Sequence, residues 1–509
     1  MESAHLVLDG ESLSLRQLNV AERVSLSETA KRKIQASRQV VERLACGEKA
    51  YYGVNTGFGV LARRKIAPTD LEKLQENLIL SHAVGVGDLA PEPIVRLMLL
   101  LKVNALAKGY SGISLEAVDM LCEFFNQRLS PLVYSQGSVG ASGDLAPLAH
   151  LVLAMMGIGE AMWRGEKMPA SEALKRCGLS PYKLKSKEGL ALINGTQFML
   201  AYAVDAILRA DVVAKTADLC AAMTLEAMRG SGAPFDERLH ALRPYPGQIA
   251  VAENIRLLTT DSEIMRSHKD CQKVQDPYSL RCAPQVHGAC RDAMDYARRV
   301  IEIELNAATD NPLVFENGDV ISGGNFHGEP LALALDTLAI ALAELASISE
   351  RRIYLLLGGD SVGGVDLPKL LMRDTGLNSG FMLPQYAAAA LVSENKILAH
   401  PASVDSIPTS LGQEDHVSMG SVSATKLHRV VQNVETVLAI ELMCAAQAMD
   451  FLRPLTSGKG IEVAHAEIRK VVSHAESDRL FHDDIQAMLK LVQSGRVLRC
   501  VEQAIGALK

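Results

Sequence analysis

Long stretches without proline, rich in Ala, Leu, Val and Met, dominate the chain. They span residues 182–233, 331–367, 409–453 and 455–509. Because proline breaks a helix interior, such stretches predict long helices. Within the third stretch, apolar residues recur at steps of three and four, which places them on one face of a helix. These residues are Leu427, Val431, Val434, Leu438 and Leu442.

Two of the predicted helices have further features. One runs from Thr196 to Arg229 and ends before Gly230, a residue typical of the position after a helix C-terminus. The other, Leu331 to Leu357, is apolar on nearly every side, with Asp336 and Glu344 as interruptions. We expect such a helix inside a bundle or in an oligomer interface.

Strand patterns are few and short. Residues 313–315 and 320–321 flank an Asn-Gly turn and predict a hairpin. His5–Leu8 and Ser12–Leu15 flank Asp9-Gly10 and predict a second hairpin in the same manner. Neither could support a sheet-based fold, and no βαβ alternation is present. The predicted fold is therefore all-α, or mainly α: a long central helical bundle with a more globular N-terminal region and a few short hairpins.

Composition narrows the class of protein. The 509 residues are 48% hydrophobic and 22% charged, as in globular proteins. A net charge of −7 without a basic tract, together with few aromatic residues, argues against nucleic acid as a partner. The longest uncharged run, Thr375–Ser393, contains polar breaks and does not predict a membrane span.

Cysteine usage and the N-terminal residues suggest a compartment. The nine cysteines are odd in number and scattered, and residues 1–10 lack the pattern of a signal peptide. We therefore expect a reduced, cytoplasmic setting. No repeat or low-complexity linker marks a boundary, so residues 1–509 are expected to form one domain. Within it, an active-site region of about residues 1–195 precedes a helix-bundle region of about 196–509.

Six segments rich in Gly, Asn, Ser and His interrupt the helical background. Taken singly, each has an ordinary structural explanation: Asn194 as an N-cap, Arg281 in a surface ion pair, Glu414 as a first-turn acid of a helix. Six such segments at the ends of long helices instead indicate a shared cavity. They are residues 51–59, 137–144, 188–197, 274–282, 322–330 and 413–419.

The segment Gly137–Asp144 is the least ordinary of the six. Its small residues leave the backbone unshielded, and Asp144 followed by Pro147 predicts the start of a helix. A helix N-terminus carries partial positive charge, so this loop is expected to bind an anion or to be electron-poor. It has neither the lysine of a phosphate loop nor the GxSxG pattern of a hydrolase.

A metal site is a second interpretation of one segment, because Cys271, Cys282, His287 and Cys290 lie close together in sequence. Their spacings of eleven, five and three do not match zinc-binding patterns. Buried thiols on helices are the better interpretation, and we expect no metal.

Ala141-Ser142-Gly143, within residues 137–150, carries a family resemblance. The chain resembles the aromatic amino acid lyase family, most closely those members that act on histidine, and the resemblance runs nearly end to end. In that family the nitrogen at the Gly143 position attacks the carbonyl at the Ala141 position, and two waters are lost. The resemblance thus implies a built-in electrophile, 4-methylideneimidazol-5-one (MIO), and no external cofactor.

The resemblance also implies roles for residues of the other segments. Tyr52 would remove the β-proton as a general base, although tyrosine needs nearby positive charge to do so. Arg281 would bind the substrate carboxylate with its planar fork. Asn194 would assist the carboxylate or MIO contacts, and Asp144 would support MIO formation.

Three further residues complete the implied site. Gln275 and Tyr278 would hydrogen-bond around the prosthetic group and the amine, and Phe326 would pack near the ring system. The chain departs from the family pattern at Leu411-Gly412, where Ala-Asn is expected, and at Gly328, where Ala is commoner. Both departures lie beside implied pocket residues and bear on substrate affinity.

Two positions favour histidine as the substrate. His82 stands where the family's histidine lyases hold the imidazole, and Glu414 offers a carboxylate to an imidazole N–H. Tyrosine lyases carry a His-Leu pair that would fall on Ser81 and His82, and phenylalanine lyases a Phe-Leu pair. A benzene ring would leave both polar groups unpaired.

The implied reaction converts L-histidine to trans-urocanate and ammonia, the first step of histidine degradation. A tyrosine or phenylalanine ammonia-lyase, or an MIO-dependent aminomutase, is the alternative on the same fold. A non-catalytic helical scaffold is the alternative outside it, against which the intact Ala141-Ser142-Gly143, Tyr52 and Tyr278 count. The resemblance further implies a homotetramer in which several chains share each active site.

Overall fold

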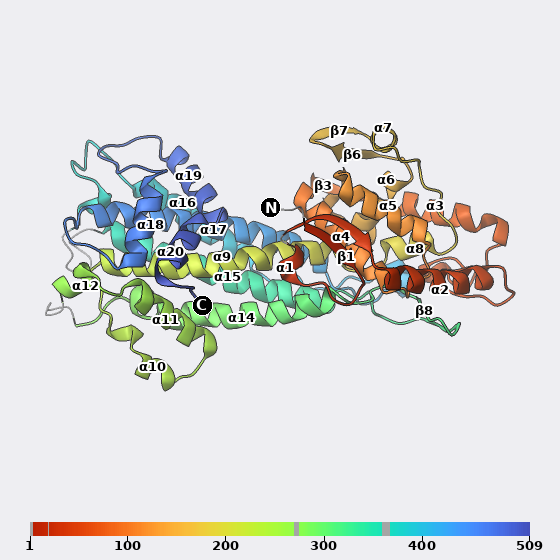
Figure 1. Ribbon diagram of the computed structural model, residues 1–509, viewed down its shortest axis with the longest axis horizontal. Helices are drawn as coiled ribbons and strands as arrows, with labels where there is room; N and C mark the ends of the chain where they lie inside the picture. The colour runs from red at the N-terminus through yellow and green to blue at the C-terminus, as the bar shows by residue number, and fades with distance from the viewer. Residues whose placement is uncertain (1–3, 19, 269–273, 359–366) are drawn as a thin grey trace. The chain divides into compact units, whose positions relative to one another are not determined.

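The structure, a computed structural model, describes residues 4–18, 20–268, 274–358 and 367–509 (Figure 1). The helices are α1 (Leu15–Leu18), α2 (Glu28–Ala45), α3 (Leu71–His82), α4 (Glu92–Ala107), α5 (Leu115–Asn126), α6 (Leu145–Met155), α7 (Ala170–Arg176), α8 (Glu188–Ile193), α9 (Gln197–Ala227), α10 (Glu237–Ala241), α11 (Pro246–Leu258), α12 (Glu263–Ser267), α13 (Tyr278–Arg281), α14 (Ala283–Glu304), α15 (Glu329–Leu357), α16 (Met382–Leu398), α17 (Gly420–Asp450), α18 (Lys459–Arg469), α19 (Phe481–Gln493) and α20 (Arg496–Ile505). The strands are β1 (Ala4–Leu8), β2 (Ala21–Leu26), β3 (Val86–Leu89), β4 (Leu129–Pro131), β5 (Tyr134–Gln136), β6 (Glu160–Trp163), β7 (Glu166–Pro169), β8 (Leu313–Val314) and β9 (Val320–Ile321). The predicted mainly α-helical fold is confirmed.

The chain divides into two compact units. Unit 1 consists of Met1–Asp205, Ala297–Asp336 and Pro401–Thr425. Unit 2 consists of Ala206–Tyr296, Thr337–His400 and Lys426–Lys509. Four of the five boundaries fall inside α9, α14, α15 and α17, and the fifth, between His400 and Pro401, follows α16. The single-domain organisation inferred from the sequence stays a prediction.

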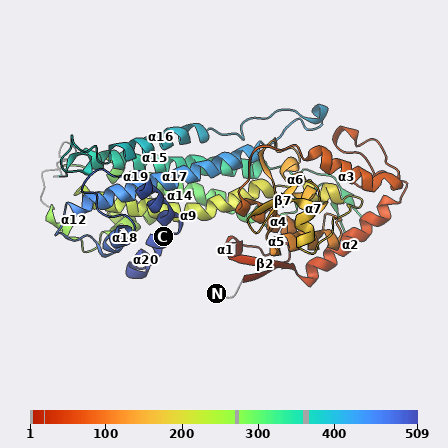
Figure 2. The same ribbon diagram turned by 90° about the horizontal axis from the view of Figure 1, so that it is seen from above.

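The parts of α9, α14, α15 and α17 that belong to unit 2 lie side by side (Figures 1 and 2). The two long helices expected around residues 196–229 and 331–357 are present as α9 and α15, within two residues of the predicted limits. The apolar stripe predicted on α17 is wholly buried, from Leu427 to Leu442. A period of three and four therefore identified the packed face of this helix correctly.

Among the described residues, α15 alone is long and apolar enough to cross a membrane by length and composition. Of its most apolar window, 67% is buried inside the chain itself. The core helix of a helical bundle has the same properties, so this pattern is weak evidence for a membrane span.

Unit 1 is built from shorter helices with small sheets at their edges. Helices α3, α6 and α8 contact one another, and α4 packs against α5. Strand β3 pairs with β5 antiparallel, and β4, β6 and β7 form a three-stranded antiparallel sheet. The contact of α3, α6 and α8 brings together the ends of three elements that carry predicted site residues.

One predicted hairpin is confirmed and the other is wrong. Strands β8 and β9 pair antiparallel around the expected Asn-Gly turn, where Gly318 has a φ of 95°. At the N-terminus β1 instead pairs parallel with β2, and the expected return strand is an irregular segment whose last residue, Leu15, begins α1. The reason is local: the Asp9 carboxylate accepts the N–H groups of Glu11 and Ser12, which turns the chain away from β1.

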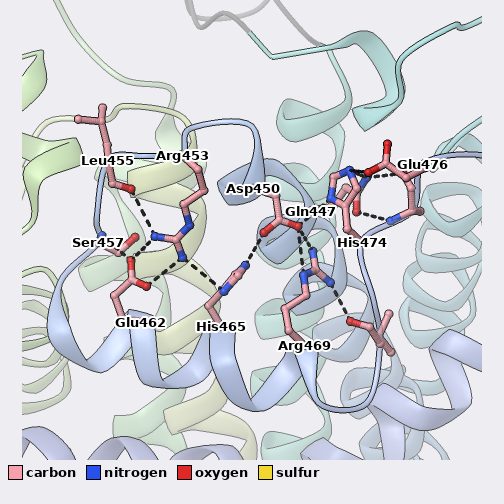
Figure 3. Close-up of polar contacts among 12 residues, drawn as sticks. Gln447, Asp450, Arg453, Leu455, Ser457, Glu462, His465, Arg469, His474 and Glu476 are labelled. Atoms are coloured by element: carbon pink, nitrogen blue, oxygen red, sulfur yellow. Dashed lines mark hydrogen bonds and ion pairs between the residues drawn. The ribbon is translucent and has the colours of Figure 1, made fainter.

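At the C-terminal end of α17, in unit 2, a carboxylate joins three elements (Figure 3). Asp450 accepts hydrogen bonds from His465 and Arg469 of α18 and from His474 of the following loop, each at 2.7 Å. Gln447, one turn earlier, bonds to the backbone of Ala475 in both directions. This cluster fixes α18 and the loop after it to the end of α17.

Candidate active site

A cavity of about 410 Å³ opens in unit 1 between the loop of residues 52–61, α3, the start of α6, the end of α8 and residues 410–414. Five residues singled out in the sequence line it: Tyr52, His82, Ser142, Asn194 and Glu414. Four separate segments of the six rich in Gly, Asn, Ser and His, together with the end of α3, thus contribute to one cavity. Leu74, Leu78, Leu190 and Ile193 supply apolar walls.

Ala141 and Ser142 occupy the centre of a tight turn. The Gly143 N–H donates to the Gly140 carbonyl at 3.2 Å, and Ser142 has a left-handed φ of 51°. Gly143 has a φ of 80°, and a Cβ there would collide with the carbonyl oxygen of Gly195. Glycine is therefore required at this position, and the turn folds the Gly143 nitrogen back toward the preceding backbone.

The backbone after Gly143 is held by the segment that precedes α9. The N–H of Gly195 donates to the Ser142 carbonyl at 3.2 Å, and the Asp144 N–H donates to the Gly195 carbonyl at 2.7 Å. The N-termini of α6 and α9 are thereby brought to the same turn. Both helix ends contribute partial positive charge there.

A helix begins after Asp144, as predicted, but the Asp144 side chain does not cap it. The carboxylate instead accepts the N–H groups of Phe198 and Met199, in the first turn of α9, at 2.9 and 3.0 Å. The hydroxyl of Ser421 donates to its other oxygen at 2.9 Å. Because the group is fully buried, the pKa of Asp144 is raised to about 7 despite these hydrogen bonds.

Asn194 follows the last residue of α8 and does not act as an N-cap. Its amide nitrogen donates to the Asp310 carboxylate at 3.0 Å and to the Asn311 carbonyl at 2.8 Å. Its side-chain oxygen is buried and has no hydrogen-bond partner. Since buried polar atoms are normally paired, this oxygen is free to receive a donor from a molecule in the cavity.

Two buried lysines next to Asn194 were missed in the sequence. Lys102 donates to the Asn194 carbonyl at 2.6 Å, and Lys187 pairs with Asp310 at 2.7 Å. Burial lowers the pKa of Lys102 to about 8. The signal in the sequence is a lone charge in the largely apolar run Leu97–Ala107, which a core helix would not otherwise carry.

Tyr52 has an environment that opposes its ionisation. Burial raises the pKa of Tyr52, the Gly59 N–H that donates to its hydroxyl at 3.3 Å lowers it, and the charge of Glu414 raises it again. None of the described residues that line the cavity is Lys or Arg. A base at this position therefore requires positive charge from outside the lining residues.

His82 and Glu414 face the cavity from two elements. His82 ends α3, and burial lowers the pKa of its imidazole while Glu414 raises it. Glu414 lies in the loop between residues 410–412 and α17, so it is not a first-turn acid of a helix. Its carboxylate accepts the Thr409 hydroxyl at 2.8 Å and keeps its other oxygen near Gly59.

The remaining predicted residues of unit 1 lie around the turn. Ala141 lines a smaller cavity of about 190 Å³ that shares His82 with the first. The Phe326 carbonyl lies 3.1 Å from the position of a Cβ on Gly143. A Cβ on Gly328 would lie 2.6 Å from the sulfur of Met199. The common alanine at that position would require α9 or its side chains to shift.

Three predicted site residues belong to unit 2. Gln275 and Tyr278 are exposed, Tyr278 by 71%. The Arg281 guanidinium stacks over the Tyr278 ring at 4.5 Å and donates to the Asp276 carbonyl at 3.0 Å. Arg281 is therefore held by backbone and ring contacts, with its remaining donors available to a carboxylate.

Of the residues considered for a metal, Cys271 lies outside the described residues. His287 donates its Nδ1 hydrogen to Asp218 at 2.7 Å, and burial raises the pKa of Cys290 to about 12. Within the described part of the chain, no group of three or more His, Cys, Asp and Glu residues is placed to hold a metal ion.

Comparison with known proteins adds independent information. The sequence profile described as aromatic amino acid lyase matches residues 13–470. A histidine ammonia-lyase of Myxococcus xanthus (strain DK1622) is 50% identical over 99% of this chain and 100% of its own length. The crystal structure of histidine ammonia-lyase from Trypanosoma cruzi matches with a TM-score of 0.90 and 43% identity, over 98% of this chain and 95% of that one. The tyrosine aminomutase of Streptomyces globisporus matches with a TM-score of 0.93 and 35% identity, over 99% and 100%.

Proposed function

The chain belongs to the aromatic amino acid lyase family, and on that premise we propose that it eliminates ammonia from L-histidine to give trans-urocanate. The observation that carries the proposal is the cavity that unites Tyr52, His82, Ser142, Asn194 and Glu414. Relatives named histidine ammonia-lyase, matched over the whole length of the chain, support the same substrate. The reaction belongs to the carbon–nitrogen lyases and would begin the degradation of histidine.

We propose further that Ala141, Ser142 and Gly143 form the MIO group. Two features of the site fit it: the turn requires glycine at position 143, and the buried Asn194 oxygen lacks a partner. When formed, the group would supply the electrophile that the unmodified side chains of the cavity lack. Gly195 and Asp144, whose backbone groups bond the turn, would hold it in place.

Each lining residue has a task that follows from its chemistry. Tyr52 would accept the β-proton of the substrate at its hydroxyl oxygen, which already receives the Gly59 N–H. His82 and Glu414 would orient the substrate imidazole, and the unpaired side-chain oxygen of Asn194 would accept a hydrogen bond from the substrate. The apolar walls would exclude water from the reacting atoms.

To act as a base, Tyr52 needs nearby positive charge, which the residues lining the cavity do not supply. Arg281 is proposed to bind the substrate carboxylate. We infer that a homotetramer with shared active sites places Arg281, Gln275 and Tyr278 of other copies at each cavity. The 71% exposure of Tyr278 in the single chain supports this assembly. A cytoplasmic location also stays a prediction.

A substrate panel tests the proposed activity. Purified protein should generate urocanate absorbance from L-histidine without added cofactor, and little or no cinnamate or coumarate from L-phenylalanine or L-tyrosine. The structural match to a tyrosine aminomutase makes β-tyrosine the product to look for in the alternative case. Turnover of L-tyrosine without turnover of L-histidine would overturn the substrate assignment.

The intact mass of the protein tests the prosthetic group. The wild-type chain should be lighter than its sequence mass by two water molecules. A mass equal to that of the unmodified sequence in an active preparation would refute MIO formation. The assembly is tested separately, by the molar mass in solution from light scattering.

A further inference from the structure

Lys102 is a buried cation that the proposed chemistry leaves without a task. It lies in α4, is 2% exposed, and is flanked along the helix by apolar residues. Burying an ammonium group is strongly unfavourable unless its surroundings compensate the lost hydration. The nearby carboxylate of Asp310 is already paired with Lys187 and bonded to the Asn194 amide. Lys102 itself is bonded to neutral oxygens.

Its strongest partner is a backbone carbonyl in the segment that holds the turn. The ammonium donates to the Asn194 carbonyl at 2.6 Å and reaches the Gln197 side-chain oxygen at 3.5 Å. The Asn194 carbonyl belongs to the same peptide group as the Gly195 N–H. That N–H donates to the Ser142 carbonyl at 3.2 Å.

These contacts form a chain of hydrogen bonds from a charge to the turn. A cation on a peptide oxygen draws electron density from the nitrogen of the same peptide and strengthens its N–H as a donor. The strengthened donor is the one bonded to the Ser142 oxygen. Inside a dry, low-dielectric region such polarisation is larger than in water.

We propose that Lys102 is a positioning residue that activates the Ser142 carbonyl through the Asn194–Gly195 peptide. The inference rests on the proposed function, because the Ser142 carbonyl is conjugated with the Ser142 β-carbon only after the Ser142 hydroxyl has left as one of the two waters. When a nucleophile adds to that carbon, negative charge develops on the Ser142 carbonyl oxygen. The Gly195 N–H stabilises this charge, and Lys102 strengthens the stabilisation. Lys102 contacts neither substrate nor the reacting atoms.

The test compares Lys102→Met with a matched variant, Lys187→Met. Both lysines are buried in unit 1, but Lys187 bonds a side-chain carboxylate rather than the Asn194 carbonyl. The primary measurement is the rate at which cyanide adds covalently to the purified protein, followed by intact mass without substrate. Steady-state kcat and KM for L-histidine, and urea unfolding, are measured on the same preparations.

We expect the Lys102→Met variant still to show the two-water mass loss of the wild type. It should add cyanide about tenfold more slowly, and its kcat should fall in similar proportion with little change in KM. Lys187→Met should add cyanide at nearly the wild-type rate. If the two variants slow addition equally, the effect belongs to buried charge in general and the inference is overturned. Unchanged addition in a folded Lys102→Met would overturn it as well.

Two further measurements keep the outcome decisive. If Lys102→Met does not fold, Lys102→Gln and Lys102→Arg replace it; Gln should slow addition, and Arg, which retains the charge, should restore part of the rate. A wild-type protein without the two-water loss would refute the proposed function itself. A wild-type protein with that loss, beside a Lys102 variant that reacts normally, would refute only the role of Lys102.

Discussion

Asp144 in unit 1 and Asp450 in unit 2 each collect hydrogen bonds from several elements, but their pKa values shift in opposite directions. Asp144 is bonded to two backbone N–H groups and a hydroxyl, and burial raises its pKa to about 7. For Asp450 burial also raises the pKa, but hydrogen bonds from His465 and the charge of Arg469 outweigh it and hold the pKa below its usual range (Figure 3). The donors to Asp144 are neutral, whereas Asp450 also receives the charged guanidinium of Arg469, and this decides the difference.

The chain therefore tolerates unfavourable electrostatics around the turn of unit 1 but not in the cluster around Asp450. In the cluster around Asp450, Arg469 supplies an opposite charge, His465 and His474 add hydrogen bonds, and these contacts stabilise the packing of α17 with α18. Around the turn of unit 1, Asp144 and Lys102 are bonded mainly to neutral backbone groups, and the Asn194 oxygen has no partner. Such arrangements cost stability and are typical of functional sites.

The largest expected effect concerns the turn itself. Ser142→Ala removes the hydroxyl that leaves as water, so the protein should keep its full sequence mass and lose at least about a thousandfold in kcat. Alanine fits the same backbone, and the free energy of unfolding should change by less than about 1 kcal/mol. Intact mass, kinetics and urea unfolding measure the three quantities. A large loss of stability would mean that the turn is mainly structural.

The next effect concerns pH. Because the pKa of Asp144 is raised to about 7, the folded protein holds a proton between about pH 4 and 7 that the unfolded chain has released. The contribution of this group to stability therefore falls as pH rises from about 4 to 7 and is constant above that range. Asp144→Asn should remove that loss and flatten the profile by a few kcal/mol. Urea unfolding at pH 5 and 8 measures it. An identical slope in both proteins would mean that Asp144 is ionised in the folded state throughout.

A smaller effect is expected at the wall of the cavity. His82→Leu removes a polar partner of the substrate imidazole, so kcat/KM for L-histidine should fall about a hundredfold. The imidazole is only half-buried, and the free energy of unfolding should change by less than about 1 kcal/mol. Equal losses of activity and stability would assign His82 to the core.

The smallest effect is expected in unit 2. Asp450→Asn should reduce the free energy of unfolding by about 1–2 kcal/mol at neutral pH. Because the pKa of Asp450 is lowered, this stability is present above about pH 4 and is lost as pH falls below it, opposite in sign to the contribution of Asp144. Urea unfolding at pH 3 and 7 shows the difference, and the two-water loss should be unchanged. Incomplete loss of the two waters in Asp450→Asn would show that the Asp450 cluster contributes to MIO formation and not only to stability.

Much of the fold could be predicted because its signals are local. Proline-free apolar stretches and steps of three and four located α9, α15 and the buried face of α17. The Asn-Gly pair located the hairpin of β8 and β9. The prediction of an N-terminal hairpin was wrong because a strand can pair with any of several partners in the chain. Here the Asp9 side chain redirects the chain within three residues, and β1 pairs with β2.

Residue type and spacing are enough to predict the long helices, the tripeptide and most of the polar residues that line the cavity. Three-dimensional contacts were needed to show that Asp144 bonds to α9 rather than capping its own helix, and that Asn194 keeps an unpaired oxygen. The tertiary structure also placed Lys102 against the Asn194 carbonyl, 92 positions along the chain. Such contacts join residues far apart in sequence, and their distances and burial set the pKa values that the chemistry depends on.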